Sequence, residues 1–303
     1  MAQTATITSA DGGVAAAPLR RPPLALLAAG AGVALLVLLP IATTLLDALQ
    51  VEPQAAGRLL FRPLVGRLLT NTIGVMAAST ACAALIGTAA AWFVVRTRLP
   101  GRRIWAALAA VPLAVPPFIS SFAWVSLSPR LQDFAGALLV VTCSYYPLIY
   151  LPVAAALRGM DPALEETARS LGLAPWRSFL RVTLPQLRPA LLGGMLLVAL
   201  NVLVEFGAFS LLRFHTFTTE VYAEYRTGFA GPQAALLAAV LILLCLVLLV
   251  AEAKVRGRAR YAQIGRGTRR HPAPLDLGWA RAPVVAGFAA LGCLCYACQR
   301  RLP

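Results

Sequence analysis

Seven long apolar runs divide this sequence, and they constrain its fold more than any other feature. The runs cover approximately residues 24–46, 68–95, 104–126, 134–157, 190–212, 229–251 and 282–299. A helix needs about 20 apolar residues to cross the ~30 Å hydrocarbon core of a bilayer. The first six runs are long enough, whereas the seventh is marginal. Because the runs are continuous and do not alternate with polar residues, the sequence predicts an all-α integral membrane protein.

The positions of the charged residues predict the orientation of these helices. The chain has 27 Lys and Arg residues against 12 Asp and Glu, and only 13% of its residues are charged. Soluble domains average about 25%. If the N-terminus is cytoplasmic, most of the basic residues fall in cytoplasmic segments, as the positive-inside rule requires. This distribution accounts for most of the net charge of +15 and argues against nucleic acid as a partner.

The apolar runs also set the domain organisation. Residues 1–23 are small and polar and are expected to be a disordered cytoplasmic N-terminus. The run that follows is too long for an ordinary signal peptide, so we interpret it as an uncleaved anchor. Residues 24–253 form the transmembrane domain, with a long cytoplasmic loop at 158–188. A basic cytoplasmic linker follows at 254–281, and then a candidate seventh helix at 282–299.

Several catalytic motifs are absent from the sequence. There is no G-x-x-x-x-G-K-[ST] phosphate loop and no G-x-S-x-G elbow, and two histidines do not form H-E-x-x-H. The six cysteines all lie in apolar runs, where we interpret them as packing residues. The sequence predicts a chain that is not an enzyme and binds no cofactor, and it indicates no particular metal ligand. Another protein would have to supply the energy for any uphill transport.

One charged segment interrupts the apolar pattern, "EETARSLGLAPWRSFLRVTLP" at residues 165–185. Asp161 and Pro162 favour a helix start just before it. Glu165 and Glu166 then fall in the first turns, where the helix dipole favours negative charge. Gly172 is placed to end the helix in the left-handed conformation. We therefore predict a short helix over about 162–171.

Both helices of this segment have an apolar face. On the first helix, Leu164, Ala168 and Leu171 follow one stripe, and Glu165 pairs with Arg169 at i, i+4. A second short helix is expected from Pro175 and is closed by Leu184-Pro185. Its apolar face holds Trp176, Phe179, Leu180 and Leu184. The pattern leaves two interpretations open, a cytoplasmic partner with an apolar groove or a hairpin lying on the lipid headgroups.

The spacing of this segment resembles the loop signature of ABC importer permeases, E-A-A-x-x-x-G-x(9)-I-x-L-P. Every spacing is kept, with Thr167 in place of Ala and Val182 in place of Ile. The resemblance implies a six-helix type I permease core in a bacterial inner membrane. It also implies an ABC ATPase subunit dimer that uses the ATP, and an extracytoplasmic substrate-binding protein. The residues that it assigns to ATPase coupling are Glu165, Glu166, Ala168, Gly172, Leu184 and Pro185.

Further stretches resemble the permeases of ferric-iron importers: "PLAVPPFISSFAW" (112–124), "CSYYPLIY" (143–150) and "VEFGAFSLLRFHTFTTEVYAEY" (204–225). Related permeases carry thiamine, polyamines or phosphonates, so these cargoes stay open. Ferric-iron permeases have two homologous halves in one polypeptide. The resemblance implies that this chain supplies a first half and the start of a second. A second half or a second copy would then complete the pathway.

Candidate residues of the transport pathway lie where prolines interrupt the apolar runs or where the runs contain polar residues. Pro112, Pro116 and Pro117 interrupt the third run, where they form either a structural kink or an unwound region that lines the pathway with Ser120 and Ser121. The only acid within an apolar run is Glu205, either at an external gate or as a satisfied structural residue. Tyr145 and Tyr146 offer phenol oxygens to a hard cation, or pack within the fourth helix. A non-transporting membrane scaffold or enzyme remains the rival class.

Overall fold

The computed structural model describes residues 24–161, 163–226, 231–257, 278 and 281–296. Every regular element in these ranges is helical. The chain divides into two compact units, residues 1–43 and 44–303. The described part of the first unit is the greater part of α1 (Leu24–Leu49), an apolar helix that contains Pro40.

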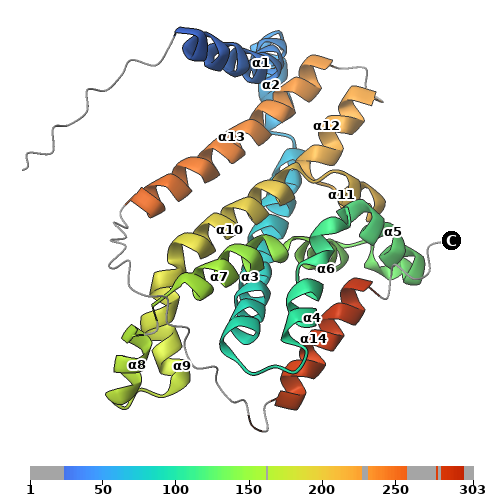
Figure 1. Cartoon of the computed structure of the whole chain (residues 1–303). Helices are drawn as coiled ribbons and strands as arrows, with labels where there is room; N and C mark the ends of the chain where they lie inside the picture. The colour runs from blue at the N-terminus through green and yellow to red at the C-terminus, as the bar shows by residue number, and fades with distance from the viewer. Residues whose placement is uncertain (1–23, 162, 227–230, 258–277, 279–280, 297–303) are drawn as a thin grey trace, which may run out of the picture. The chain divides into compact units, whose positions relative to one another are not determined.

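The second unit holds the remaining helices (Figure 1). They are α2 (Pro53–Leu60), α3 (Pro63–Arg96), α4 (Arg102–Leu108), η1 (Val111–Ala114), α5 (Pro117–Leu127), η2 (Pro129–Leu131), α6 (Phe134–Tyr145), α7 (Pro147–Gly159), α8 (Ala163–Ser170), α9 (Pro175–Ser178), η3 (Phe179–Thr183), α10 (Leu184–Val204), α11 (Gly207–Leu211), α12 (Phe217–Arg226), α13 (Gly231–Gly257) and α14 (Arg281–Tyr296).

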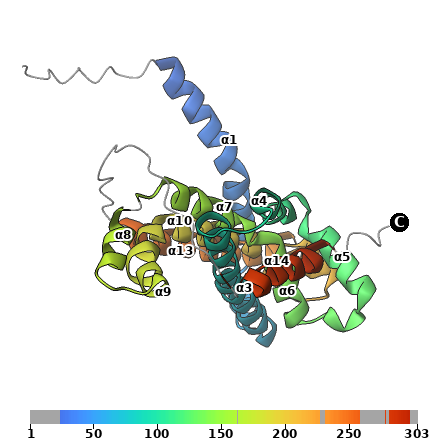
Figure 2. The same cartoon turned by 60° about the horizontal axis from the view of Figure 1, so that its bottom comes forward.

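The core of the second unit lies where α3, α7 and α10 pack against one another. Figures 1 and 2 both show α3 beside α6 and α7. Two glycines allow the close approach of these helices. A Cβ atom at Gly87 would lie 2.9 Å from the Tyr146 carbonyl oxygen, and one at Gly194 would lie 2.9 Å from Ile149 Cα. Small residues at such crossings are typical of membrane helix bundles.

We therefore expect Gly194→Val to lower the free energy of unfolding by about 1–3 kcal/mol, because the added side chain must displace the α7 backbone. Gly66→Val is the matched control, since a Cβ atom there would meet nothing within 4 Å. Thermal unfolding of the purified protein, followed by tryptophan fluorescence, measures the difference. Equal unfolding temperatures for the two variants would contradict the packing described.

Five helical segments are long and apolar enough to cross a membrane, or six if one bent pair counts as a span. The predicted runs 24–46, 68–95 and 134–157 lie within such segments, and so do residues 231–251 of the run 229–251, whose first two residues lie outside the described ranges; their helical character is confirmed. The fourth run consists of two helices, α6 and α7, that meet at Tyr146. The candidate seventh helix corresponds to α14, and residues 297–299 of its predicted range lie outside the described residues.

The predicted span over 104–126 is broken at its prolines, as the sequence indicated. The run is divided into α4, the short turn η1 and α5, and the axis bends by 93° between Arg102–Ala114 and Pro117–Leu127. Pro116 and Pro117 have no N–H group to donate and cannot continue the preceding helix. Pro117 instead occupies the first position of α5, where a missing N–H is tolerated.

The prediction for 190–212 is wrong at both ends. The helix begins earlier, because α9, η3 and α10 run on as one span, Trp176–Val204. η3 is a π-helical turn in which the Leu184 N–H donates to the Phe179 carbonyl oxygen. Leu184 and Pro185 therefore lie inside a continuous helix and do not close a separate unit. The helix stops at Val204, and α11 is a separate short helix.

Candidate functional sites

The first candidate site is the elbow, which we define as α8, the turn after it and α9 (residues 163–178). Asp161 caps α8, since its Oδ1 accepts a hydrogen bond of 3.0 Å from the Ala163 N–H. At the other end Gly172 has φ = +85°. The Gly172 and Leu173 N–H groups donate to the Arg169 and Ala168 carbonyl oxygens. This is the Schellman arrangement, and it confirms the predicted left-handed helix stop.

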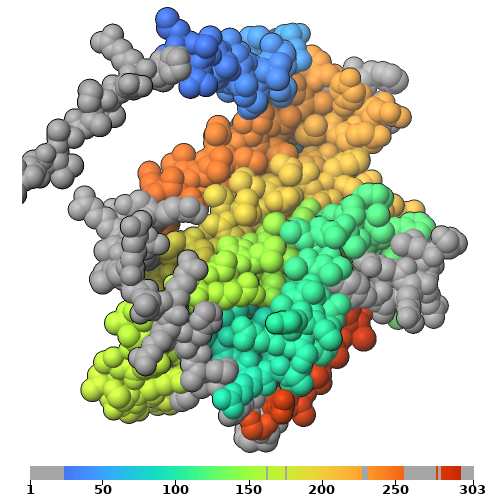
Figure 3. Space-filling model, viewed as in Figure 1, coloured from blue at the N-terminus to red at the C-terminus, as the bar shows by residue number. Residues whose placement is uncertain are grey.

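The elbow presents large apolar side chains on its surface. Leu164, Leu171 and Trp176 are 58%, 79% and 61% exposed. Figure 3 shows this part of the surface at the lower left. Ala168 is buried, so the predicted stripe is split, with its alanine against the protein and its leucines outward. Of the other residues predicted to couple to an ATPase, Glu166 and Gly172 are exposed, and Leu184 and Pro185 are half-buried in α10.

Glu165 lies on the inner side of α8 and joins the elbow to the end of α3. Its Oε1 accepts a hydrogen bond of 2.6 Å from Arg169 Nη2, which confirms the predicted pair. Its Oε2 lies 3.5 Å from Nη2 of Arg96, the last residue of α3. Both Arg96 and Glu165 are buried. The carboxylate of Glu165 therefore connects α8 to the end of a core helix.

Sequence reasoning missed Arg96, which it counted only as one of the basic residues of a cytoplasmic segment. No local pattern relates Arg96 to Glu165, because they lie on different helices far apart in the chain. The guanidinium is incompletely paired: in the described structure, its Nε and Nη1 have no hydrogen-bond partner. Buried donors without partners destabilise a fold, so Arg96 depends strongly on the carboxylate of Glu165.

The second candidate site surrounds Glu205, the residue that directly follows α10. Its Oε2 accepts a hydrogen bond of 2.5 Å from the Tyr145 hydroxyl of α6, and its Oε1 accepts one of 2.9 Å from the Ala208 N–H of α11. The Thr218 hydroxyl of α12 donates to the Glu205 carbonyl oxygen at 2.7 Å. Glu205 therefore links three helices, and both oxygens of its carboxylate are satisfied.

The other predicted pathway residues lie apart from this link. Ser121 is buried and donates to the Pro117 carbonyl oxygen at 2.9 Å. Ser120 lines a small cavity between α5 and α6 together with Ser144. Tyr146 is buried in the α3–α7 core. The structure thus brings Tyr145 and Glu205 together, and the pathway and gate roles of these residues stay predictions.

Glu205→Ala is expected to lower the free energy of unfolding by about 1–3 kcal/mol, because the Tyr145 hydroxyl and the Ala208 N–H both lose their acceptor. Glu205→Gln keeps an acceptor oxygen and should cost less. Thermal unfolding of the two variants measures which of them loses more stability. If Glu205→Gln also transports normally in an intact complex, the gate role is wrong and Glu205 is structural only.

Comparison with known proteins defines the class of this chain. Residues 83–260 match the family described as "Binding-protein-dependent transport system inner membrane component". The matched range contains α7, the elbow, α10 and the Glu205 link. The chain belongs to this family, and it is a multi-pass inner-membrane component of a transport system.

Individual relatives are named for the transport of different substances. The Fe(3+)-transport system permease protein FbpB 2 of Haemophilus influenzae is 38% identical over 269 residues, which cover 89% of this chain and 53% of that protein. The molybdenum transport system permease protein ModB of Escherichia coli is 31% identical over 153 residues, 45% of this chain and 65% of that protein. The chain therefore spans about half the length of the first relative and less than two thirds of the second.

Solved structures confirm the predicted fold class. A bacterial alginate ABC transporter, in complex with an alginate pentasaccharide-bound periplasmic protein, gives a TM-score of 0.60 at 14% identity, covering 78% of this chain and 94% of that one. The MetNI methionine ABC transporter in an inward-facing conformation gives 0.55 at 18% identity, covering 65% and 97%. These likenesses show the fold alone, that of an ABC importer permease.

Proposed function

We propose that this chain is a membrane-spanning part of an ATP-driven importer that carries ferric iron into the cytoplasm. A separate ABC ATPase dimer binds the elbow and uses the ATP, so the chain itself is a transport subunit and not an enzyme. An extracytoplasmic binding protein delivers the cargo. A second permease half, or a second copy of this chain, forms the other wall of the pathway. The distribution of basic residues supports a cytoplasmic N-terminus and a cytoplasmic elbow.

The observation that carries the proposal is the exposed apolar surface of the elbow. Leu164, Leu171 and Trp176 lie on a segment that is otherwise polar, and nothing in the described chain covers them. Exposed apolar residues that gather in this way mark a contact surface. The pairing of Glu165 with Arg96 connects the same segment to α3. A partner that pulls on the elbow would therefore move a core helix, as coupling to ATP hydrolysis requires.

Ferric iron is supported by a similarity that runs over 269 residues to a relative named for Fe(3+) transport. Relatives named for molybdenum and sulfate transport share shorter stretches, of 153 and 191 residues. The aromatic hydroxyls of the fourth run add little support, because Tyr145 donates to Glu205 and Tyr150 donates to the Ala106 carbonyl oxygen. Thiamine, a polyamine or a phosphonate would use the same fold.

Uptake into proteoliposomes tests the proposal. The chain is reconstituted with its partner ATPase and binding protein, and radioactive ferric iron is supplied outside. We expect uptake that requires ATP and stops when the catalytic lysine of the ATPase is replaced. Uptake of molybdate or sulfate in place of iron would overturn the assignment of ferric iron as the cargo. Failure of any ATPase to bind the chain would overturn the assignment of the chain as a transport subunit.

A further inference from the structure

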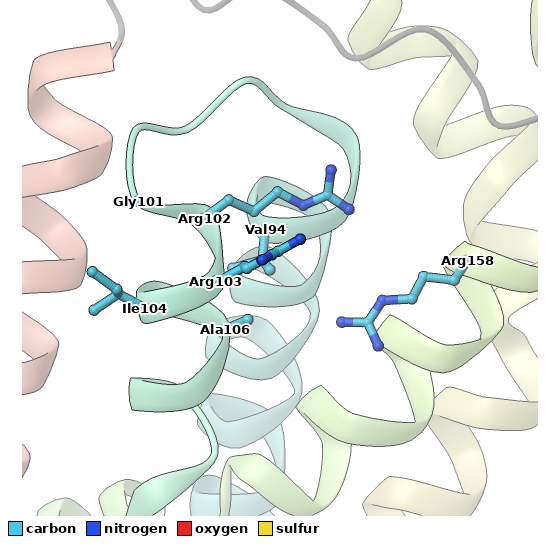
Figure 4. Close-up of a pocket in the computed structure, with 7 residues that line it drawn as sticks. All are labelled: Val94, Gly101, Arg102, Arg103, Ile104, Ala106 and Arg158. Carbon is cyan, nitrogen blue, oxygen red and sulfur yellow. The ribbon is translucent and has the colours of Figure 1, made fainter.

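A cavity of about 710 Å³ lies where α3 ends, α4 begins and α7 ends. Figure 4 shows the guanidinium groups of Arg102, Arg103 and Arg158 turned toward the space between α4 and α7. Among the residues that the structure describes, no aspartate or glutamate lines the cavity. The elbow and the Glu205 link described above contribute no residue to it, so it is a separate site.

No described acidic residue supplies a counter-charge to the three guanidinium groups. In the part of the chain that the structure describes, no ion pair or side-chain hydrogen bond is formed by Arg102, Arg103 or Arg158. Guanidinium groups bind phosphate with two parallel N–H···O bonds, and several of them around one space favour a ligand with more than one acceptor oxygen. The charge of the cavity therefore fits a phosphate group.

The rest of the lining is apolar. Val94 of α3 and Ala106 of α4 lie beside the arginines, whereas the Ile104 side chain, which is 64% exposed, points to the other side of α4 (Figure 4). An inorganic anion would gain nothing from Val94 and Ala106. A ligand that carries a phosphate next to a hydrocarbon chain would contact both parts of the cavity, the arginines with its headgroup and the apolar side chains with its chain.

The cavity also lies at the right depth for such a ligand. The candidate spans Pro63–Arg96 and Phe134–Gly159 both end beside it. Helices that cross the hydrocarbon core end in or beyond the headgroup layer, so the ends of these two spans place the cavity outside the hydrocarbon. Trp105 lies next to the cavity wall, and its ring N–H donates to the Pro100 carbonyl oxygen at 3.0 Å. Tryptophan is enriched at this level of the membrane.

We propose that this cavity binds the phosphate group of an anionic membrane phospholipid. Arg102, Arg103 and Arg158 hold the headgroup, and an acyl chain lies along Val94 and Ala106. The bound phosphate places a negative charge among three like charges and joins the α3–α4 turn to the end of α7. The site does not depend on which cargo the protein carries.

Native mass spectrometry of the purified chain tests this assignment with two lipids of equal chain length, dioleoylphosphatidylglycerol and dioleoylphosphatidylcholine. We expect retention of phosphatidylglycerol in preference to phosphatidylcholine. The triple variant Arg102→Gln, Arg103→Gln, Arg158→Gln should bind phosphatidylglycerol at least about tenfold more weakly, since each cation near an anionic headgroup contributes to the attraction.

A charge-matched control separates this site from general attraction. The triple variant Arg58→Gln, Arg62→Gln, Arg67→Gln removes the same charge from exposed residues of α2, the α2–α3 turn and the first turns of α3. It should bind phosphatidylglycerol as the unchanged protein does. Size-exclusion chromatography checks that both triple variants fold. If the cavity variant aggregates, Arg158→Gln alone should weaken binding in the same direction by about threefold.

Three results would overturn the proposal. The first is equal retention of phosphatidylglycerol by the two triple variants. The second is equal retention of the two lipids by the unchanged protein. The third is displacement of phosphatidylglycerol by inorganic phosphate at matched concentration, which would make this an anion site that does not select lipid.

Discussion

Glu165→Ala is expected to weaken the attachment of α8 to α3 by about 3–5 kcal/mol, because it leaves the buried Arg96 guanidinium without its counter-charge. Arg96 is 4% exposed, and in the described residues its Nε and Nη1 already lack partners. The loss of the carboxylate also removes the hydrogen bond from Arg169. Hydrogen exchange of the α8 amides measures the effect, and we expect exchange to become faster in α8 than in α7.

Two variants control this prediction. Glu166→Ala removes the neighbouring carboxylate, which is exposed, and should leave exchange in α8 almost unchanged. The double variant Arg96→Met, Glu165→Leu replaces both charges with apolar groups and should recover most of the attachment, because no buried charge remains unpaired. Slow exchange in Glu165→Ala, equal to that of the unchanged protein, would show that the pair does not hold the elbow.

Gly172→Pro is expected to separate ATP hydrolysis from transport. Gly172 has φ = +85°, whereas proline is held near −65°. The Gly172 N–H also donates to the Arg169 carbonyl oxygen, and proline has no N–H. The turn between α8 and α9 must therefore change its path, and transport should fall by at least about tenfold, the equivalent of ~1.4 kcal/mol. ATP hydrolysis by the bound ATPase should persist.

Gly172→Asn is the matched control, because asparagine also adopts the left-handed conformation at helix ends. It should keep transport close to that of the unchanged protein. Hydrolysis and uptake are measured together in the same proteoliposomes. If Gly172→Pro transports as well as Gly172→Asn, the conformation of this turn has no part in coupling.

The elbow was predictable because its signals are local. A helix cap, an i, i+4 charge pair and a glycine stop are each set by residues within one or two turns. The structure confirms Asp161, the Glu165–Arg169 pair and Gly172 in these roles. The spans were predictable for a similar reason, since about 20 consecutive apolar residues identify a membrane helix without knowledge of its neighbours.

The features that sequence reasoning missed depend on contacts between distant segments. Arg96 meets Glu165 only because α8 folds back onto the end of α3. Glu205 is a link between helices because Tyr145 of α6 reaches it. The three arginines of the cavity entered the positive-inside count as separate charges, and their convergence follows from the turn between α3 and α4 and its position beside α7.

The continuity from α9 into α10 has a different cause. Leu184-Pro185 is a strong local signal for a break, and the sequence predicts that the second short helix ends there. The π-helical turn η3 directly precedes the proline, and its wider hydrogen bonding, from the Leu184 N–H to the Phe179 carbonyl oxygen, lets the helix continue through Pro185. The elbow is therefore the direct extension of a membrane span, which strengthens its mechanical connection to the core.

Photo-crosslinking from the elbow tests the central claim most directly. A photoreactive phenylalanine analogue is placed at Trp176, or as a control at Phe61, which is 90% exposed and lies just after α2. The complex is irradiated in membranes that contain the ATPase. We predict crosslinks to the ATPase from position 176 that change when ATP is added, and none from position 61. Crosslinks from position 176 to lipid alone would contradict the account and identify the elbow as a hairpin on the membrane surface.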